Sequence, residues 1–245
     1  MKKVILFLSA ITITLSSCSS SDSSSSTTNV DDVLPIKITD TYNDGSVVSN
    51  ITYNGKKIKQ VSSNDGELIK YTYTGDLITK VETFYDGELD TTETLTYNAS
   101  GQLIGYTDIS DFWDNQETYT YNSDGTVSFT RIADGTFYSS GSITMIGNDV
   151  SQVVINYDDT GLTSTNTYTY DTSYSPFKNI VGYKWYLLAG LSENQTQGFD
   201  HNVLSYTESL SSFSNYTSTY QYNSLNFPVS ILTSDDDALT TIQYN

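Results

Sequence analysis

The sequence has few of the residues on which many catalytic and metal-binding sites depend. One cysteine, one histidine and three prolines occur among its 245 residues. A lone cysteine excludes an intramolecular disulfide, and a lone histidine excludes zinc sites built from several histidines. His201 can join a Ser-His-Asp set only with its neighbour Asp200, and we interpret it as a loop histidine. The sequence also lacks the GxSxG, phosphate-loop and HExxH motifs.

Positive charge and helix-forming residues are also scarce. The 11 lysine and arginine residues stand against 29 acidic residues, which gives a formal net charge of -18. Such a chain repels the phosphates of nucleic acids, so nucleic-acid binding is not expected. Alanine, the strongest helix former, occurs five times, whereas tyrosine, which favours strands, occurs 21 times. The composition therefore predicts an all-β protein.

The first residues have the pattern of a secretory signal. Lys2 and Lys3 precede an apolar stretch over 4–15, which is shorter than the ~20 residues of a membrane-spanning helix. The stretch ends in Leu15-Ser16-Ser17-Cys18, which resembles the lipobox of bacterial lipoproteins. The resemblance implies cleavage before Cys18 and acylation of its thiol. Because Ser19 follows, it also implies an outer-membrane location in a Gram-negative cell.

These features divide the chain into three segments. Residues 1–17 are the expected signal peptide, 18–34 a lipidated, serine-rich flexible tether, and 35–245 a β-hairpin repeat domain. The lipid on Cys18 makes the membrane a partner of the protein. Several acyl chains give a durable anchor, since each buried methylene contributes about 0.8 kcal/mol. Whether the domain faces the periplasm or the cell exterior stays open.

Turn signals recur about every 11 residues in the part of the chain that follows the tether. Asn-Gly and Asp-Gly pairs supply the positive φ angles that tight hairpin turns require. Between the turns lie stretches of about 6–9 residues in which rings alternate with threonine, as in Tyr119-Thr120-Tyr121. This period of two predicts a meander of antiparallel strands with a ring-and-aliphatic face and a Thr/Ser face.

A tyrosine or methionine before each Asn-type turn marks a repeat. The intervals between successive landmarks are 20, 24, 24, 24, 25, 52 and 22 residues, which predicts one hairpin per unit. We interpret the interval of 52 residues as two units with an insertion. The prediction is an up-and-down antiparallel meander of about 14–16 strands, curled or closed as a barrel so that its edges are covered. The landmarks are Tyr53, Tyr73, Tyr97, Tyr121, Met145, Tyr170, Tyr222 and Tyr244.

The insertion lies near 176–199. Pro176 and the apolar residues that follow it are compatible with a short helix, and a long loop is the alternative. As a helix, the segment could cover one open end of the sheet.

The motif Tyr-Thr-Tyr-Asn-x-x-Gly-x-Leu resembles the YD repeat of bacterial RHS proteins. It occurs over 118–127, 95–103 and, in a shorter form, 71–77. Together with the lipobox, the tether and the insertion that begins Tyr174-Ser175-Pro176-Phe177, it resembles a group of Gram-negative lipoproteins of unknown function. The resemblance implies a porin-like β fold over most of 35–245. It implies no catalytic residue and no cofactor.

A porin-like fold raises the alternative of a barrel inserted in the membrane. Membrane strands run about 9–11 residues and carry a lipid-facing apolar band about 25 Å tall. The strands expected here are shorter, and their second face carries threonine, serine, glutamate and lysine. We therefore favour a barrel outside the bilayer whose tyrosine-rich face fills an interior or binds a ligand.

Aromatic residues near loops are the main candidates for ligand contact. Such rings can stack on sugars or fill a partner's pocket, although tyrosine on alternating strand positions is also ordinary sheet packing. The candidates are Phe112, Trp113, Tyr183, Trp185 and Tyr186.

Acidic residues offer two further alternatives. Glu82, Glu93 and Glu117 lie on expected strands, where a rigid pair of carboxylates could act as in glycosidases. The turn aspartates, densest at Asp235-Asp236-Asp237, raise the question of calcium, with plain hairpin turns as the simpler interpretation. No cofactor is expected.

The sequence thus predicts a non-enzymatic lipoprotein that presents an acidic, tyrosine-rich β domain as a binding or structural module. A glycan or an envelope protein is the expected kind of partner. The alternatives are a carboxylate-dependent carbohydrate-active enzyme and a membrane-inserted barrel. Most of the acidic residues lie beyond residue 81, far along the chain from the anchor.

Overall fold

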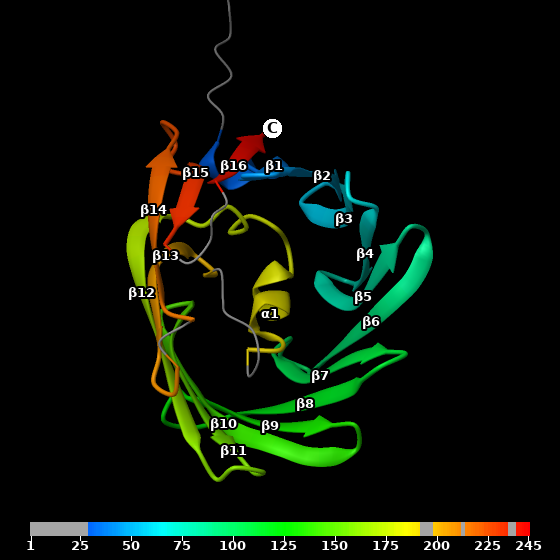
Figure 1. Ribbon diagram of the computed structural model, residues 1–245, viewed down its shortest axis with the longest axis vertical. Coiled ribbons are helices and arrows are strands. Elements are labelled where there is room, and N and C mark those ends of the chain that lie inside the picture. Colours follow the sequence, from blue (N-terminus) through cyan, green and yellow to red (C-terminus); the bar gives the residue numbers. More distant parts are fainter. Residues whose placement is uncertain (1–28, 192–197, 212–213, 235–238) are drawn as a thin grey trace, which may run out of the picture.

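The protein is a closed β-barrel. A computed structural model describes residues 29–191, 198–211, 214–234 and 239–245. Across this part of the chain sixteen strands follow one another as antiparallel neighbours, and the first, β1 (Pro35–Tyr42), pairs with the last, β16 (Leu239–Tyr244). Figure 1 shows these two strands side by side where the ring closes. The predicted all-β meander is confirmed, and closure rather than curling is the form it takes.

The other strands have these bounds: β2 Gly45–Asn54, β3 Lys57–Ser63, β4 Glu67–Thr74, β5 Leu77–Tyr85, β6 Glu88–Tyr97, β7 Leu103–Ser110, β8 Asp114–Tyr121, β9 Val127–Ala133, β10 Thr136–Ile146, β11 Asp149–Tyr157, β12 Thr163–Tyr174, β13 His201–Glu208, β14 Tyr216–Tyr222 and β15 Pro228–Thr233. A 3-10 helix, η1 (Val30–Asp32), precedes β1, and one α-helix, α1 (Tyr183–Leu188), lies between β12 and β13.

Tight turns join most strands. Between β5 and β6 the turn residues Asp86 and Gly87 both have positive φ, 49° and 89°. Two successive positive φ values match the right-handed twist of the flanking strands, which is why Asp-Gly recurs at such turns. The register of the meander therefore follows from the turn sequences.

The two faces of the barrel wall differ as the alternation predicts. On β8, Glu117 and Tyr119 point inward and are buried, whereas Thr118 and Thr120 point outward and are exposed. The same arrangement holds on the other strands, so the lumen holds rings and aliphatic side chains. Outward-facing, exposed threonines include Thr72, Thr96, Thr118, Thr120, Thr130, Thr167, Thr169, Thr207, Thr217 and Thr219.

The repeat landmarks lie near the ends of the eight even-numbered strands. The interval of 52 residues contains a single hairpin, β13–β14, and the long connection over 175–200, so the interpretation as two units is wrong. Several of these tyrosines donate a hydrogen bond to a backbone carbonyl of the preceding strand. Tyr97 Oη lies 2.6 Å from the carbonyl oxygen of Ile78, and Tyr170 Oη lies 2.6 Å from that of Val150.

All of these landmarks lie at one end of the barrel, which we call the termini end. It carries the β2–β3, β4–β5, β6–β7, β8–β9, β10–β11 and β14–β15 turns, the start of β1 and the end of β16. The opposite end, called the far end, carries the connections that begin after odd-numbered strands.

The described part of the connection over 175–200 folds into the barrel instead of covering an open end. Figure 1 shows α1 inside the ring of strands, and its backbone lies close to β5. Gly182, just before α1, has φ 77°, and a Cβ there would lie 2.6 Å from the carbonyl oxygen of Asp76. A glycine is therefore required where the connection meets the barrel wall.

A buried aspartate on β11 anchors the return of this connection to the wall. Asp149 Oδ1 accepts hydrogen bonds from the backbone amides of Phe199, Asp200 and His201, at 2.9, 2.9 and 3.4 Å. Its Oδ2 lies 2.7 Å from His201 Nδ1. The lone histidine therefore serves a structural contact at the start of β13.

Residues 29–34, placed in the tether by the sequence, pack against the barrel. Val33 and Leu34 are buried, and Leu34 exchanges hydrogen bonds with Asn245 at 2.9 and 3.1 Å. The expected signal peptide, Cys18 and most of the expected tether lie outside the described residues. Within the described residues no helix is long and apolar enough to span a membrane.

Tyr97→Phe tests the tyrosine contacts. The change removes the hydroxyl that satisfies the Ile78 carbonyl and leaves the ring in place, so we expect a loss of about 1 kcal/mol in unfolding free energy. Urea denaturation measures it. Tyr85→Phe, at an exposed site where the hydroxyl bonds Glu67, is the matched control and should change stability little. Equal effects of the two changes would contradict the role given to Tyr97.

Candidate ligand-binding cavity

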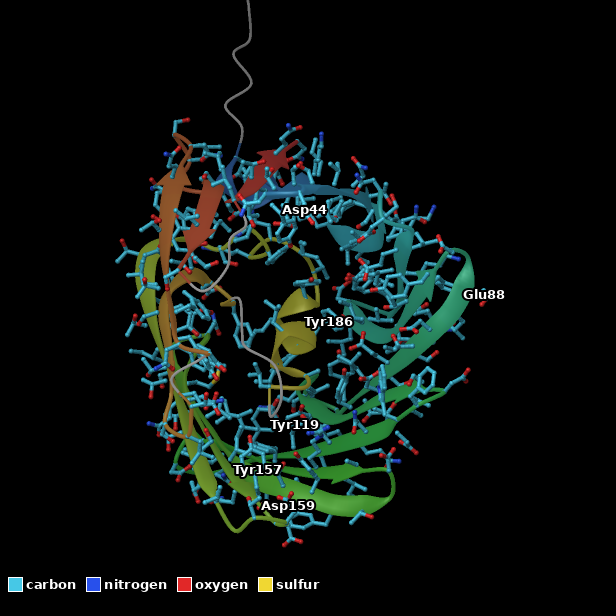
Figure 2. All side chains as sticks on the ribbon, viewed as in Figure 1. Asp44, Glu88, Tyr119, Tyr157, Asp159 and Tyr186 are labelled. Carbon is cyan, nitrogen blue, oxygen red and sulfur yellow. The ribbon has the colours of Figure 1, made fainter. Side chains whose placement is uncertain are left out.

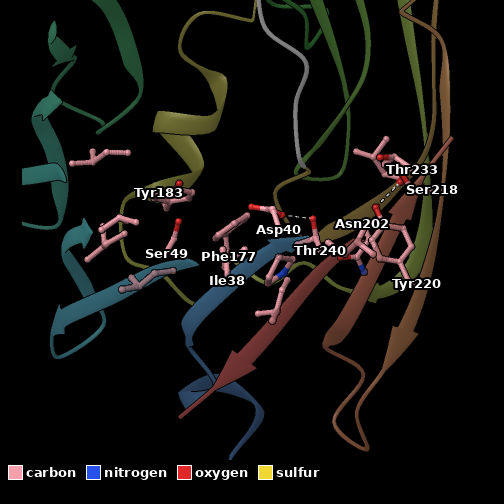
Figure 3. Close-up of a pocket in the computed structure, with 18 of the residues that line it drawn as sticks. Ile38, Asp40, Ser49, Phe177, Tyr183, Asn202, Ser218, Tyr220, Thr233 and Thr240 are labelled. Atoms are coloured by element: carbon pink, nitrogen blue, oxygen red, sulfur yellow. Dashed lines mark hydrogen bonds between the residues drawn. The ribbon is translucent and has the colours of Figure 1, made fainter. Parts of the chain in front are cut away.

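A cavity of about 630 Å³ occupies part of the barrel lumen. This size is within the range of small-molecule sites, which is roughly 300–1,000 Å³. Its wall comes from β1–β4 and β13–β16, and the 175–200 connection contributes Pro176, Phe177 and Tyr183 (Figure 3). The cavity therefore lies between the barrel seam and the segment that enters the lumen.

The cavity wall has an apolar layer and a polar layer. On each of five strands an isoleucine points inward, and the inward position two residues away, nearer the far end, carries an acid or a hydroxyl. The pairs are Ile38 and Asp40 on β1, Ile51 and Ser49 on β2, Ile69 and Glu67 on β4, Ile231 and Thr233 on β15, and Ile242 and Thr240 on β16.

The polar layer consists of hydrogen-bond acceptors and hydroxyls. Thr240 donates to Asp40 Oδ1 across the β1–β16 seam, as the dashed line in Figure 3 marks. Tyr85 Oη donates to Glu67 Oε1 at 3.0 Å. No lysine, arginine or histidine occurs among the described residues that line the cavity. The site therefore offers negative charge and no fixed positive charge.

Aromatic rings form the inner side of the cavity. The ring of Phe177 lies 5.2 Å from that of Tyr183, and Tyr183 lies 6.3 Å from Tyr71, measured between centroids. Burial raises the pKa of Tyr183 to about 12, so its hydroxyl stays protonated at neutral pH. These rings come from β4 and from the connection, which together separate the cavity from the rest of the lumen.

On the other side of α1 a largely buried carboxylate is held by two tyrosines. Glu93 Oε1 accepts from Tyr106 Oη at 2.6 Å, and Oε2 accepts from Tyr186 Oη at 3.0 Å. Burial raises the pKa of Glu93, and Asp108, opposite it across β6 and β7, raises it further, while the two tyrosine hydrogen bonds lower it. Tyr186, labelled beside α1 in Figure 2, reaches from α1 to the barrel wall at β6. This contact fixes α1 to the wall.

Polar groups continue around the lumen on β7–β13. Trp113 Nε1 donates to Asp108 Oδ2 at 3.0 Å. Glu117 and Arg131, both buried, lie opposite each other on β8 and β9. A smaller hollow of about 210 Å³ is lined by Arg131, Tyr138, Ile155, Tyr157, Asn166, Tyr206 and Glu208.

Charge is sorted between the two barrel ends. The described parts of the far-end connections contain no lysine, arginine or histidine. The termini end carries Lys56, Lys57, Lys178 and Lys184, and it carries fewer acidic residues than the far end. Acids in or beside the far-end connections are Asp44, Asp65, Glu67, Asp86, Glu88, Asp90, Asp111, Asp114, Asp134, Asp158, Asp159 and Glu208.

The aromatic candidates from the sequence do not form one site. Tyr183, Trp185 and Tyr186 lie on α1 inside the barrel, and of the five candidates only Tyr183 lines the cavity. Phe112 and Trp113 lie in the β7–β8 connection at the far end, where Phe112 is 85% exposed. The five residues remain predicted ligand contacts, but they lie at two separate places, α1 and the β7–β8 connection.

The acidic candidates also separate. Glu82 faces outward and pairs with Lys80 at 2.9 Å, whereas Glu93 and Glu117 face the lumen. Asp235, Asp236 and Asp237 lie outside the described residues. Among the described residues no group of three or more histidines, cysteines and acids is arranged to hold a metal ion.

Sequence reasoning missed the cavity residues and the sorting of charge. The pairs of isoleucine and polar residue could have been found from the alternation, because each pair is two residues apart on one strand. The charged end could have been found by separating odd from even turns, since an up-and-down meander places them at opposite ends. The Glu93–Tyr186 contact has no local signal, because its residues are 93 positions apart.

Comparison with solved structures finds a similar fold in a porin-like protein from Bacteroides uniformis ATCC 8492, known from a crystal structure at 2.32 Å resolution. The two chains share 12% sequence identity with a TM-score of 0.53. The match covers 85% of this chain and 96% of the other. At this identity the likeness shows the porin-like barrel fold alone. No family model and no curated protein matches the sequence.

Glu93→Gln tests the buried carboxylate. The folded protein holds the Glu93 proton more tightly than the unfolded chain, so stability falls as pH rises from the ordinary pKa of 4.5 through the raised one. Glutamine carries no charge to desolvate. We therefore expect the Tm of Glu93→Gln minus the Tm of wild type to be higher at pH 7 than at pH 4.

Glu88→Gln removes the same charge from an exposed position at the far end and is the matched control for these thermal scans. If the difference in Tm between Glu93→Gln and wild type stays constant from pH 4 to pH 7, or equals that of the control, burial does not raise the pKa of Glu93.

Proposed function

We propose that the protein is a lipid-anchored, non-enzymatic binding protein that takes a small ligand into the barrel lumen. The observation that supports this best is the cavity of about 630 Å³, which has an isoleucine layer, a polar layer and aromatic rings. Binding sites for small molecules combine a mostly apolar wall with a few placed polar groups in this way. Barrels of other sizes also use the lumen for ligands.

The anchor in this proposal is the acylated Cys18, and the location is the outer membrane of a Gram-negative cell. The lipobox-like Leu15-Ser16-Ser17-Cys18 and the following Ser19 support it. The YD-like hairpin phrase supports kinship with repeat-containing lipoproteins. The tether joins the barrel at the termini end, because β1 begins there.

The outer face of the barrel supports a domain that stands in water. Lipid-facing strands of membrane barrels present an apolar band about 25 Å tall. Here many outward positions of the strands are threonine or serine, and the exposed apolar side chains among them form at most small groups, such as the cross-strand pairs Ile132–Phe137 and Leu232–Leu239. An apolar band of that height is not formed by the described residues. We therefore favour lipid anchoring over insertion.

The position of Glu93, a candidate for glycosidase-type chemistry, does not support hydrolysis in this cavity. Both oxygens of Glu93 already accept hydrogen bonds from tyrosines, and Glu93 lies outside the set of residues that line the cavity. A general acid must reach the substrate in a plausible pose. A glycan-hydrolysis screen showing turnover that Glu93→Gln abolishes would favour the carbohydrate-active alternative.

Palmitate labelling tests the anchor. Cells that produce the full chain should incorporate radiolabelled palmitate into it, and Cys18→Ser should abolish incorporation because the thiol is the acylated group. Ser17→Ala, which keeps a small residue before the cysteine, is the control and should stay labelled. Label in Cys18→Ser, or none in wild type, rules out the proposed anchor.

Fluorescence titration with the neutral probe N-phenyl-1-naphthylamine tests the cavity. We expect saturable binding to the purified chain, which Ile231→Trp weakens at least about tenfold because the indole fills cavity volume. Leu232→Trp makes a similar change at the next position, whose side chain is 50% exposed, and should leave binding within about twofold.

No saturable binding by wild type, or equal loss in the two tryptophan variants, would overturn the proposed lumenal site. Circular dichroism of both variants establishes that the barrel has formed before binding is compared.

A further inference from the structure

The charges around the cavity limit what its ligand can carry. Its described lining contains two carboxylates, Asp40 and Glu67, and no cationic side chain. A ligand with an anionic head would bring like charges together in a confined space, at a considerable free-energy cost. A cationic head would find opposite charge there.

The two layers of the wall set the orientation of the ligand. The isoleucines lie toward the termini end, and Pro176 and Phe177 add apolar surface to the wall. Asp40, Thr240 and Thr233 lie nearer the far end. An apolar chain therefore fits the isoleucine layer, and a polar head fits the polar layer. An alkyl body gains from burial against isoleucine, at about 0.8 kcal/mol for each methylene.

The rings favour a positive head over a neutral polar one. Tyr216 borders the cavity near the far end, on the side of the polar layer. An ammonium group within about 6 Å of a ring face gains cation–π energy, which a neutral hydroxyl does not. A glycan would need donors and acceptors along its whole length, whereas the wall toward the termini end includes the isoleucine layer.

The far end of the barrel adds a long-range contribution. Its connections carry acids on every described hairpin from β1–β2 to β11–β12 and no cationic side chain. Such a ring of one sign raises the local concentration of cations at the adjacent lumen. The field therefore acts in the same direction as Asp40 and Glu67.

We infer that the cavity binds an amphipathic amine, with the aliphatic part against the isoleucine layer and the ammonium group beside Asp40. This inference rests on the proposed lumenal binding function and specifies its ligand class. Asp40 is the specificity residue, because it lies in the polar layer. The hydrogen bond that its Oδ1 accepts from Thr240 holds the carboxylate in place, as Figure 3 shows.

Three probes that differ only in the head group test the inference. Decylamine, decanol and decanoate carry a positive, neutral and negative head on the same alkyl chain. Each displaces N-phenyl-1-naphthylamine from the purified full chain in a competition titration at pH 7. We expect decylamine to displace the dye at a concentration at least about tenfold lower than decanol, and decanoate to be weakest.

Asp40→Asn removes the charge and keeps an oxygen that can accept from Thr240. It should weaken decylamine about tenfold and leave decanol unchanged. Asp44→Asn makes the same change in the exposed β1–β2 turn and is the matched control, with a decylamine loss below about twofold. Raising the salt concentration should weaken decylamine and not decanol.

Equal displacement by decylamine and decanol, or equal effects of Asp40→Asn and Asp44→Asn, would overturn the amine assignment. The lumenal site would stand in that case, because dye binding and its loss in Ile231→Trp are measured separately. Absence of dye binding in wild type would instead overturn the proposed function itself.

Discussion

The pairing of β1 with β16 is the constraint on which the rest of the structure depends. An open sheet of this many strands would leave two rows of unpaired backbone groups, and closure pairs both rows with each other. Ile38 then lies opposite Ile242 and Asp40 opposite Thr240. Asn245 and Leu34 extend the seam by two further hydrogen bonds. Closure therefore creates an inside and brings the first and last hairpins into one cavity wall.

Once the sheet is closed, the period of two in the strands becomes a difference between lumen and solvent. Tyrosines that would line one face of an open sheet instead converge, and their hydroxyls need partners because they are buried. Some donate to a carbonyl of the preceding strand, as Tyr97 does, and Tyr186 donates to Glu93. The 175–200 connection fills part of the lumen and leaves a cavity beside the seam.

The sequence allowed the hairpin unit to be predicted because its signals are local. A landmark tyrosine, an Asn-type turn and alternating rings all lie within one unit, so Tyr97 and Tyr121 mark strand ends correctly. Closure was left open, since a curled sheet has the same alternation. The position of α1 was missed because an apolar segment such as 183–188 can cover an end or enter a lumen. Which of the two positions the helix takes depends on contacts with residues far away in the sequence, such as the hydrogen bond from Tyr186 to Glu93.

The site was harder to predict than the fold. Loop aromatics such as Phe112 attract attention in a sequence, yet the cavity wall consists of isoleucines that look like ordinary core. Their significance appears only when β1, β2, β15 and β16 become neighbours through closure. In the sequence nothing distinguishes Asp40 from the other acidic residues. Its significance appears when β1 pairs with β16, because Asp40 then lies opposite Thr240 inside the barrel.

Hydrogen exchange at the seam tests this account most directly. In a closed barrel the amides of β1 and β16 that face each other are hydrogen-bonded, so they should be protected as strongly as those of β8 and β9, which are paired on both sides. Rapid exchange of every second amide along β1 and β16, with protection kept elsewhere, would show an open sheet. That result would contradict the closed barrel and the cavity that depends on it.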